Sequence, residues 1–368
     1  MTGLTSKEEP GWVGGVVPPP EMLGATGIQI MELDCREQAA YLRQLIDAYQ
    51  SNATIRAELN TFRELAARSG AIVFAGMGAS YCSAIAGSNL LQSHGRLSFT
   101  VDAGEWQQYG RSIDNDIALT MLLTTSGESA ELVELTRTCG GQTHGLLCNN
   151  SASTCWKQSA NKLPILAGPE YGCATKTFTN ATAATIILAS EMLGIAWERD
   201  ANLVAWSYAA DLEAVFHLRA GLEAFCRGAA SIEIIGRGSA YGGAIMGALT
   251  IREMTGFRVA PHTGAGFRHG PVMDVDASHV AIVFALGRAA ALGFKLAAEC
   301  NRRGGKVVLV SNEDCTPSSL LFPVRIGGVP EPWEGITSLL VPQALTLAMV
   351  ERTGCRLPPR FQYGVMEL

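Results

Sequence analysis

The sequence predicts an α/β fold built from two tandem domains, each a mostly parallel five-stranded sheet flanked by helices in three layers. An internal repeat at an offset of 160 residues is the first observation: residues 72–81 (IVFAGMGASY) align with residues 232–241 (IEIIGRGSAY). In both copies a strand-like run ends in a Gly-x-Gly turn and an Ala-rich, helix-favouring stretch follows. With 368 residues, 48% of them apolar, the chain can bury two cores, and its 40 glycines suit tight strand-to-helix turns.

Four segments follow along the chain. Residues 1–27 are rich in Gly and Pro without apolar periodicity, which predicts a flexible N-terminal arm. The first domain is expected at 28–200, where amphipathic helices at 31–67 precede the sheet, and the second at 201–352. Residues 353–368 form a tail.

Apolar runs separated by helix-favouring stretches predict the strands, and their alternation predicts parallel pairing. A helical segment near 202–227 should bridge the domains, and a late helix should occupy 334–352. Ligands of such sheets bind at the carboxyl ends of the strands. The predicted strands are 71–75, 98–102, 117–123, 144–148 and 163–166 in the first domain, and 231–235, 257–260, 279–285, 306–310 and 322–325 in the second.

Composition restricts the partners. A net charge of -6 without clustered Lys or Arg argues against nucleic acid, but a small phosphate can still be held by backbone amides and hydroxyls. No apolar run approaches the roughly 18 residues that span a bilayer. The ten dispersed cysteines read as reduced thiols, and no His, Asp or Glu group has metal-ligand spacing. We expect a cytoplasmic protein without membrane, metal or cofactor.

One loop combines hydroxyls with a helix start. Thr124, Thr125, Ser126 and Ser129 follow an apolar strand and precede the helix-like run 130–136, so their hydroxyls and free amides can satisfy the oxygens of a phosphate. Ser80, after the first Gly-x-Gly turn, adds another donor. The hydroxyl cluster is lost in the second copy, which predicts one phosphate pocket per chain in the N-terminal half. The alternative is an ordinary helix cap.

A second candidate group lies in the other half. Glu253 is late in a helical pattern at 244–254, and His269 follows in a Gly-rich loop stiffened by Pro271. A carboxylate and an imidazole can share proton abstraction beside a carbonyl and protonation of a sugar ring oxygen. The alternative is a surface glutamate and a loop-capping histidine. His262 is expected in the same loop, and Arg237 is expected to support its turn or to face a partner.

Six motifs occur in an order that resembles a known family. Together they look like the tandem sugar isomerase (SIS) domains of the isomerase half of glutamine:fructose-6-phosphate aminotransferase and of its stand-alone deaminase and deglycase relatives. The resemblance covers about residues 30–368. The motifs are Gly78–Tyr81, Thr124–Ser129, Glu170–Thr179, Gly236–Gly238, Gly247–Glu253 and Phe267–Pro271.

The resemblance implies roles for individual positions. Glu253 matches the acid/base that moves a proton between C1 and C2 of the sugar, and His269 matches a ring-opening histidine that reaches the site from a neighbouring subunit. A homodimer and a tail over the active site are therefore implied. The phosphate positions are Ser80, Thr124, Ser126 and Ser129, with Thr125 where the aminotransferase has glutamine. The other substrate positions are Gly78, Ala79, Cys173 and Lys176; the alternative for Lys176 is a structural role near a helix start.

Departures from the family pattern redirect the expected reaction. Thr250 and Gly364 stand where the aminotransferase has lysines, the second of them its Schiff-base lysine, and the chain shows no glutaminase domain. The resemblance therefore favours a phosphosugar deaminase or a fructosamine-6-phosphate deglycase, which needs phosphate anchoring, ring opening and proton transfer but no lysine. The alternatives are an aldose-ketose phosphosugar isomerase and a non-catalytic sugar-phosphate sensor.

Overall fold

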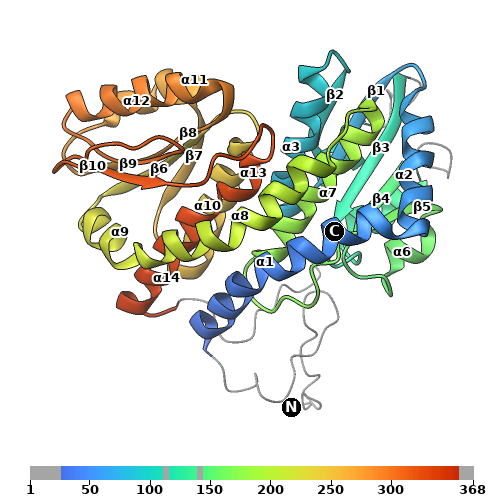
Figure 1. Ribbon diagram of the computed structural model, residues 1–368, viewed down its shortest axis with the longest axis horizontal. Helices are drawn as coiled ribbons and strands as arrows, with labels where there is room; N and C mark the ends of the chain where they lie inside the picture. Colours follow the sequence, from blue (N-terminus) through green and yellow to red (C-terminus); the bar gives the residue numbers. More distant parts are fainter. Residues whose placement is uncertain (1–25, 111–115, 139–143, 356–368) are drawn as a thin grey trace, which may run out of the picture.

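The computed structural model describes residues 26–110, 116–138 and 144–355, which form two α/β halves side by side (Figure 1). Most of the predicted arm (1–27) and tail (353–368, with Gly364) lies outside the described residues. The first half has a parallel five-stranded sheet in the order β2-β1-β3-β4-β5. Its strands are β1 (Ala71–Gly76), β2 (Ser98–Asp102), β3 (Ile117–Thr124), β4 (His144–Cys148) and β5 (Asn161–Pro164).

The second sheet repeats this plan. Read from its β7 edge, the order is β7-β6-β8-β9-β10, again all parallel, so the first strand of each half lies between the second and the third. The internal repeat is therefore a repeat of topology as well as sequence. The strands are β6 (Ser231–Gly236), β7 (Val259–Thr263), β8 (His279–Ala285), β9 (Lys306–Ser311) and β10 (Leu321–Arg325).

The predicted α/β fold class is confirmed, and most strand bounds agree to within one residue, with four differences along the chain. β5 occupies 161–164 instead of the predicted 163–166, and the single helix predicted at 334–352 is two helices, 334–337 and 340–353. The strand predicted at 257–260 begins at Val259, because the preceding helix continues to Thr255 and ends on Gly256 in a left-handed cap with φ 67°. The helical segment predicted at 202–227 is two helices, α8 (Glu198–His217) and α9 (Arg219–Cys226), which meet at Leu218.

Helices cover both faces of each sheet. Ile72 and Phe74 of β1 face the core shared with α1, α2 and α7, whereas Val73 and Ala75 face a separate core under α5 and α6. This alternation follows from the two-residue period of a strand. The first-half helices are α1 (Gly27–Ser51), α2 (Ala53–Ala66), α3 (Ala79–Ser93), α4 (Ala103–Glu105), the π-helical turn η2 (Trp106–Gly110), α5 (Ala130–Thr138), α6 (Thr154–Gln158) and α7 (Lys176–Leu193).

The second half has a similar arrangement, with α12 on the outer face of its sheet and α10 and α14 toward the first half. After α8 and α9, the helices and turns of this half are α10 (Ala240–Thr255), α11 (Gly264–Arg268), η4 (Pro271–Asp274), η5 (Gly287–Ala289), α12 (Ala290–Arg302), α13 (Glu334–Thr337) and α14 (Leu340–Thr353). Within the described ranges, no helix has the length and apolarity that a membrane span requires.

Helices from both halves pack directly on each other at the junction. α10 lies against α3, and a Cβ atom added to Gly242 would come within 2.4 Å of the carbonyl oxygen of Cys82. A buried amide pair, Gln38 and Gln343, joins α1 to α14 through a 3.1 Å hydrogen bond. The close packing fixes the position of α10, which carries Glu253, relative to the first sheet.

Candidate functional site

The predicted phosphate loops lie at the carboxyl ends of two adjacent strands. β1 leads into Gly78, Ala79 and Ser80, and β3, its neighbour in the sheet, leads into Thr124–Ser129. From β1 the chain adds β2 on one side of the sheet and then returns to add β3 on the other side, so a topological switch point lies between β1 and β3. Proteins with α/β sheets bind ligands at such switch points. The structure therefore brings the two predicted loops to the same edge of one sheet.

The loop after β3 is shaped by its own hydroxyls. Thr124 Oγ1 accepts a hydrogen bond from the amide of Gly127 at 3.0 Å, and Ser126 Oγ accepts one from Glu128 at 3.3 Å. Thr124 and Ser126 are nearly buried, whereas Thr125 and Ser129 are partly exposed. Thr124 thus helps to hold the turn, and Ser129 precedes α5, where free helix amides favour an anion.

Gly127 makes this loop possible. Its φ of 70° lies in the left-handed region, and a Cβ atom there would come within 2.1 Å of Ser153 Oγ. On the next residue, the carboxylate of Glu128 accepts a 2.9 Å hydrogen bond from the amide of Thr154, which ties the loop to α6. The loop is therefore held in shape before any ligand arrives.

Glu253 extends from α10 toward the first half. Burial raises the pKa of the Cys82 thiol to about 12, and the negative charge of Glu253 raises it further. Burial likewise raises the pKa of Cys173, to which the charge of Glu253 also contributes. Because such effects require proximity, the Glu253 carboxylate lies near α3, which begins one residue before Ser80, and near the loop that precedes α7.

The loop containing Cys173 is braced by Glu170. One oxygen of this carboxylate accepts hydrogen bonds from the amide and hydroxyl of Thr175, both at 2.9 Å, and from the amide of Thr177 at 3.2 Å. The hydroxyl of Thr177 donates to the other oxygen. Cys173 itself is buried.

Lys176 is held in an internal ion-pair cluster. Only 1% of its side chain is exposed, its Nζ lies 3.0 Å from Asp34 Oδ1 and pairs with Glu37, and it sits 4.9 Å from the ring centroid of Tyr41. These contacts tie the start of α7 to α1. Of the two roles considered for Lys176, the packing favours the structural one.

His269 lies apart from this group, on the second half. It is exposed at the end of α11, whose first residue, Gly264, packs against the guanidinium of Arg237. The expectation that His262 belongs to a loop is wrong: it lies in β7, where the two-residue period of the strand points its ring at Glu233 of β6, with Nε2 2.7 Å from Glu233 Oε2.

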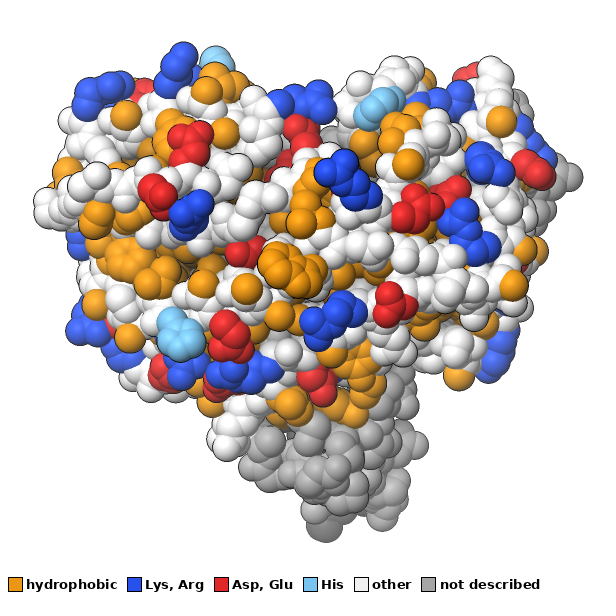
Figure 2. Space-filling view, in the orientation of Figure 1, with side chains coloured by type: hydrophobic (Ala, Val, Ile, Leu, Met, Phe, Trp, Pro, Cys, Tyr) orange, Lys and Arg blue, Asp and Glu red, His pale blue; other side chains and the backbone are white. Residues whose placement is uncertain are grey.

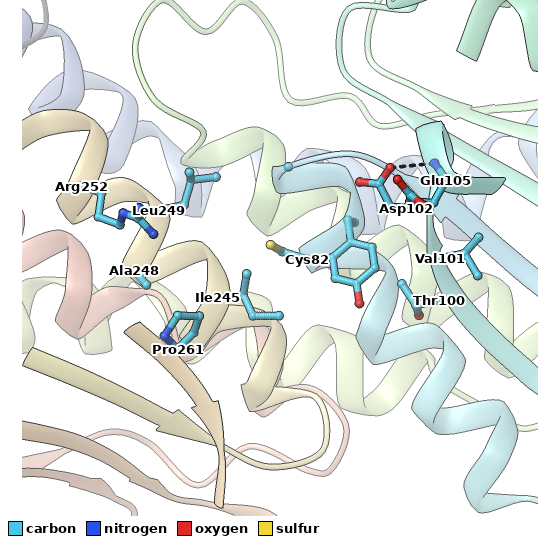
Figure 3. Close-up of a pocket in the computed structure, with 12 residues that line it drawn as sticks. Cys82, Thr100, Val101, Asp102, Glu105, Ile245, Ala248, Leu249, Arg252 and Pro261 are labelled. Atoms are coloured by element: carbon cyan, nitrogen blue, oxygen red, sulfur yellow. Dashed lines mark hydrogen bonds between the residues drawn. The ribbon is translucent and has the colours of Figure 1, made fainter. Parts of the chain in front are cut away.

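A groove of about 580 Å³ opens between the two halves beside Gly78 (Figure 3). Tyr81, Cys82 and the end of β2 form one wall, and Ile245, Leu249 and Arg252 of α10 form the other. The carboxylate of Asp102 is turned into the backbone, where it accepts hydrogen bonds from the amides of Gly104 and Glu105 at 2.9 and 3.2 Å.

Gly78 is a predicted substrate position that lines this groove, but the prediction missed its other walls. Asp102 and Arg252 are 150 residues apart and belong to no shared motif, and only the packing of α10 on α3 brings them to opposite walls. Nothing in their local sequence could have revealed it.

Neither charge nor metal geometry suggests another class of site. On the face seen in Figure 2, Lys and Arg side chains are interspersed with Asp and Glu instead of forming a basic stripe. No group of three or more His, Cys, Asp or Glu side chains in the described part of the chain is arranged to hold a metal ion. The nine cysteines in that part are free thiols.

Comparison with known proteins agrees with the duplicated topology. The family model of the SIS domain matches the chain twice, at residues 65–191 and 227–350. The chain belongs to the SIS-domain family. Each match of this SIS protein includes one of the two sheets, from β1 to β5 and from β6 to β10.

Curated relatives match only part of their own length. The SIS protein is 27% identical over 276 residues to a glutamine--fructose-6-phosphate aminotransferase [isomerizing] of Bartonella henselae, covering 71% of this chain and 46% of the relative. The Bartonella quintana protein of that name is 29% identical over 258 residues, or 66% and 42% of the two chains. The chain thus spans a little under half the length of these relatives.

Solved structures share its fold. The C-terminal domain of the Francisella tularensis glucosamine-fructose-6-phosphate aminotransferase has a TM-score of 0.77 at 18% identity, covering 89% of this chain and 97% of that one. Tagatose-6-phosphate ketose/aldose isomerase of Escherichia coli has 0.74 at 19%, covering 94% and 98%. Glucosamine-6-phosphate deaminase of Thermotoga maritima has 0.69 at 17%, covering 90% and 96%.

Proposed function

We propose that this SIS protein is a phosphosugar-processing enzyme that deaminates an amino-sugar phosphate or removes the amine from a fructosamine 6-phosphate. The observation that carries the proposal is the position of Glu253. Its carboxylate, supplied by the second half, acts electrostatically on Cys82 of α3 and on Cys173 before α7, both in the first half. One hexose phosphate bound there would have a phosphate cradle and an acid/base at hand.

The phosphate would bind at the switch point between β1 and β3. Ser80, Ser126 and Ser129 would donate hydroxyl hydrogen bonds, and the amides at the start of α5 would add favourable dipoles. Thr124 would act mainly by shaping the loop through its bond to Gly127. Such a site needs no lysine, because hydroxyls and amides can supply donors to every phosphate oxygen.

Glu253 would transfer the proton between C1 and C2 of the open-chain sugar. Removal of the proton from one of these carbons gives an enolamine, and protonation of the neighbouring carbon converts the enolamine into an imine. Water then adds to the imine carbon, and the C–N bond breaks to leave a carbonyl group and the free amine or ammonia. The absence of an imine-forming lysine suits this route. Thr250 is buried and bonds to the Met246 carbonyl at 2.9 Å, and Lys176 is paired with Asp34 and Glu37.

His269 would open the sugar ring from a second copy of the chain. It is exposed at the end of α11 and is thus accessible to another subunit, and Arg237 packs against the first residue of that helix. The proposed working form is therefore a homodimer with composite sites.

A substrate panel tests the reaction. Purified protein is mixed with glucosamine 6-phosphate, fructoselysine 6-phosphate or fructose 6-phosphate, and ammonia, free amine and aldose phosphate are measured, with Glu253→Gln as the inactive reference. Release of ammonia or amine from an aminated substrate supports the proposal. Turnover of fructose 6-phosphate alone would establish the isomerase alternative, which uses the same two residues, and tight binding without turnover of any substrate would establish the sensor.

A further inference from the structure

The second half contains a counterpart of the proposed phosphate site. Its switch point lies between β6 and β8, where the turn Gly236–Ser239 follows one strand and the loop Leu286–Ala289 follows the other. At the offset of 160 residues these segments correspond to Gly76–Ala79 and Ser126–Ser129.

The glycines at matching positions of the two copies share positive φ angles. Gly78 and Gly238 have φ angles of 52° and 56°, and Gly127 and Gly287 have 70° and 58°. The side chains of the two copies differ. Leu286 and Ala289 stand at the positions of Ser126 and Ser129. Arg288 replaces Glu128, and Ser239 replaces Ala79. The second copy therefore keeps the positive-φ glycine turns of an anion-binding loop but lacks the two serine hydroxyls of the loop after β3.

Two carboxyl groups occupy this loop. Glu331 Oε2 accepts a 3.0 Å hydrogen bond from the amide of Arg288, while Oε1 lies 2.8 Å from the guanidinium Nε of the same residue. A Cβ atom on Gly287 would lie 3.0 Å from Glu334 Oε1 and 3.2 Å from Glu331 Oε2. Both side chains thus touch the glycine at the centre of the turn.

Glu334 is an unusual residue to find there. It is only 4% exposed, and its Oε2 has no hydrogen-bond partner among the described residues. Burial raises the pKa of Glu334 to about 7; the charge of Glu331 adds to this rise, while Ser239 opposes it. The next residue, Gly335, packs on Ser239, where an added Cβ atom would lie 3.1 Å from the Cβ of Ser239. A carboxyl group buried at such cost points to a specific role.

We propose that the anion-binding loop of the second half binds the carboxyl groups of Glu331 and Glu334 in place of a phosphate, and that removing them uncovers a second oxyanion site of the phosphate class. The proposal rests on the proposed function only in treating the first loop as the phosphate site. The internal ligand also places α13 against α10 and α7 at the junction of the two halves.

The test compares two double variants with the unmodified protein. Glu331→Ala/Glu334→Ala empties the loop, whereas Glu331→Gln/Glu334→Gln removes the charge but fills nearly the same volume. Binding of inorganic phosphate is measured by calorimetry. The Ala variant is expected to bind one equivalent more than the unmodified protein, and the Gln variant no more than the unmodified protein. A folded Ala variant that gains no equivalent overturns the proposal.

The two proposals fail in different ways. Unmodified protein that binds no phosphate, with an Ala variant that binds one equivalent, refutes the first-half cradle and supports the internal ligand. If both proteins bind one equivalent of phosphate, only the internal-ligand proposal is refuted.

If the double variant does not fold, Glu331→Ala alone is heated with and without formate, which can replace the lost carboxylate. Formate should raise its melting temperature more than that of the unmodified protein, and equal shifts overturn the proposal.

Discussion

Gly242 of α10 lies directly on Cys82 of α3, so close that an added Cβ atom would stand 2.4 Å from the Cys82 carbonyl oxygen. This contact joins the two halves three turns before Glu253 on the same helix. The distance between the proposed acid/base and the proposed phosphate loop is therefore set by a glycine whose own chemistry is inert.

Gly242→Ala is expected to push α10 away from α3. Overpacking of this kind costs about 1–3 kcal/mol, and the displaced Glu253 should lower kcat more than it raises KM. Thermal unfolding and steady-state kinetics on the substrate found by the panel measure both effects. Gly328→Ala is the control, because its added Cβ would meet only Asn312 at 3.7 Å. Unchanged stability and kcat in Gly242→Ala would contradict this account of the junction.

Glu253→Gln should abolish turnover while leaving phosphosugar binding intact. Loss of a general acid/base typically reduces the rate by about 10²- to 10⁴-fold, and the amide keeps the size of the side chain. Rates and calorimetric binding are compared with Glu351→Gln, a change at a half-exposed glutamate on α14. An active Glu253→Gln enzyme would exclude the proposed role.

Ser126→Ala should weaken the binding of a phosphosugar. Hydrogen bonds to charged groups contribute about 1.5–3 kcal/mol, so Kd should rise about 10- to 100-fold by the same principle. The exposed Ser51→Ala on α1 serves as the control. If Kd stays the same in both variants, the loop after β3 does not hold the phosphate.

Complementation tests whether His269 acts across subunits. Mixed dimers of His269→Ala and Glu253→Gln chains contain one site with both intact residues, so random mixing should restore about a quarter of the wild-type activity from two inactive proteins. The activity is measured after joint refolding or co-expression. No recovery, with hybrid dimers shown by native mass spectrometry, would place both residues in one chain.

Lys176→Met should destabilise the fold in a pH-dependent way. The change leaves the Asp34 carboxylate buried without its cation, which costs about 3–5 kcal/mol. Burial, together with the charge of Glu170, already raises the pKa of Asp34 to about 7 against the opposing effect of Lys176. A raised carboxyl pKa costs stability at high pH, and this cost falls as the group takes up a proton. The deficit of the variant should therefore shrink as the pH is lowered from 8 to 6.

The double variant Lys176→Met/Asp34→Asn separates a structural lysine from a substrate-binding one. Removing both charges should recover most of the stability measured by denaturant unfolding, with an unchanged KM. Recovered stability with a KM raised tenfold or more would show that Lys176 contacts the substrate.

Local patterns were sufficient for the strands. The runs predicted at 144–148 and 279–285 coincide with β4 and β8, because fully buried parallel strands are short, mostly apolar segments bounded by turn residues. The edge strands β5 and β7 begin two residues away from their predicted starts. The break at Leu218 between α8 and α9 was not predictable in the same way, since no Pro or Gly marks it and the apolar pattern continues across it.

The sequence by itself determined that the fold is used twice and that hydroxyls remain in only one copy, because repeats and strand-turn-helix signals are local in the chain. Tertiary structure decided what each side chain faces. Packing of α10 on α3 brings Glu253 to the first half, the neighbourhood of Asp34 draws Lys176 into an internal ion pair, and Glu331 and Glu334 fold back onto a loop more than 40 residues earlier. These relationships depend on distances between remote segments, which periodicity and composition do not encode.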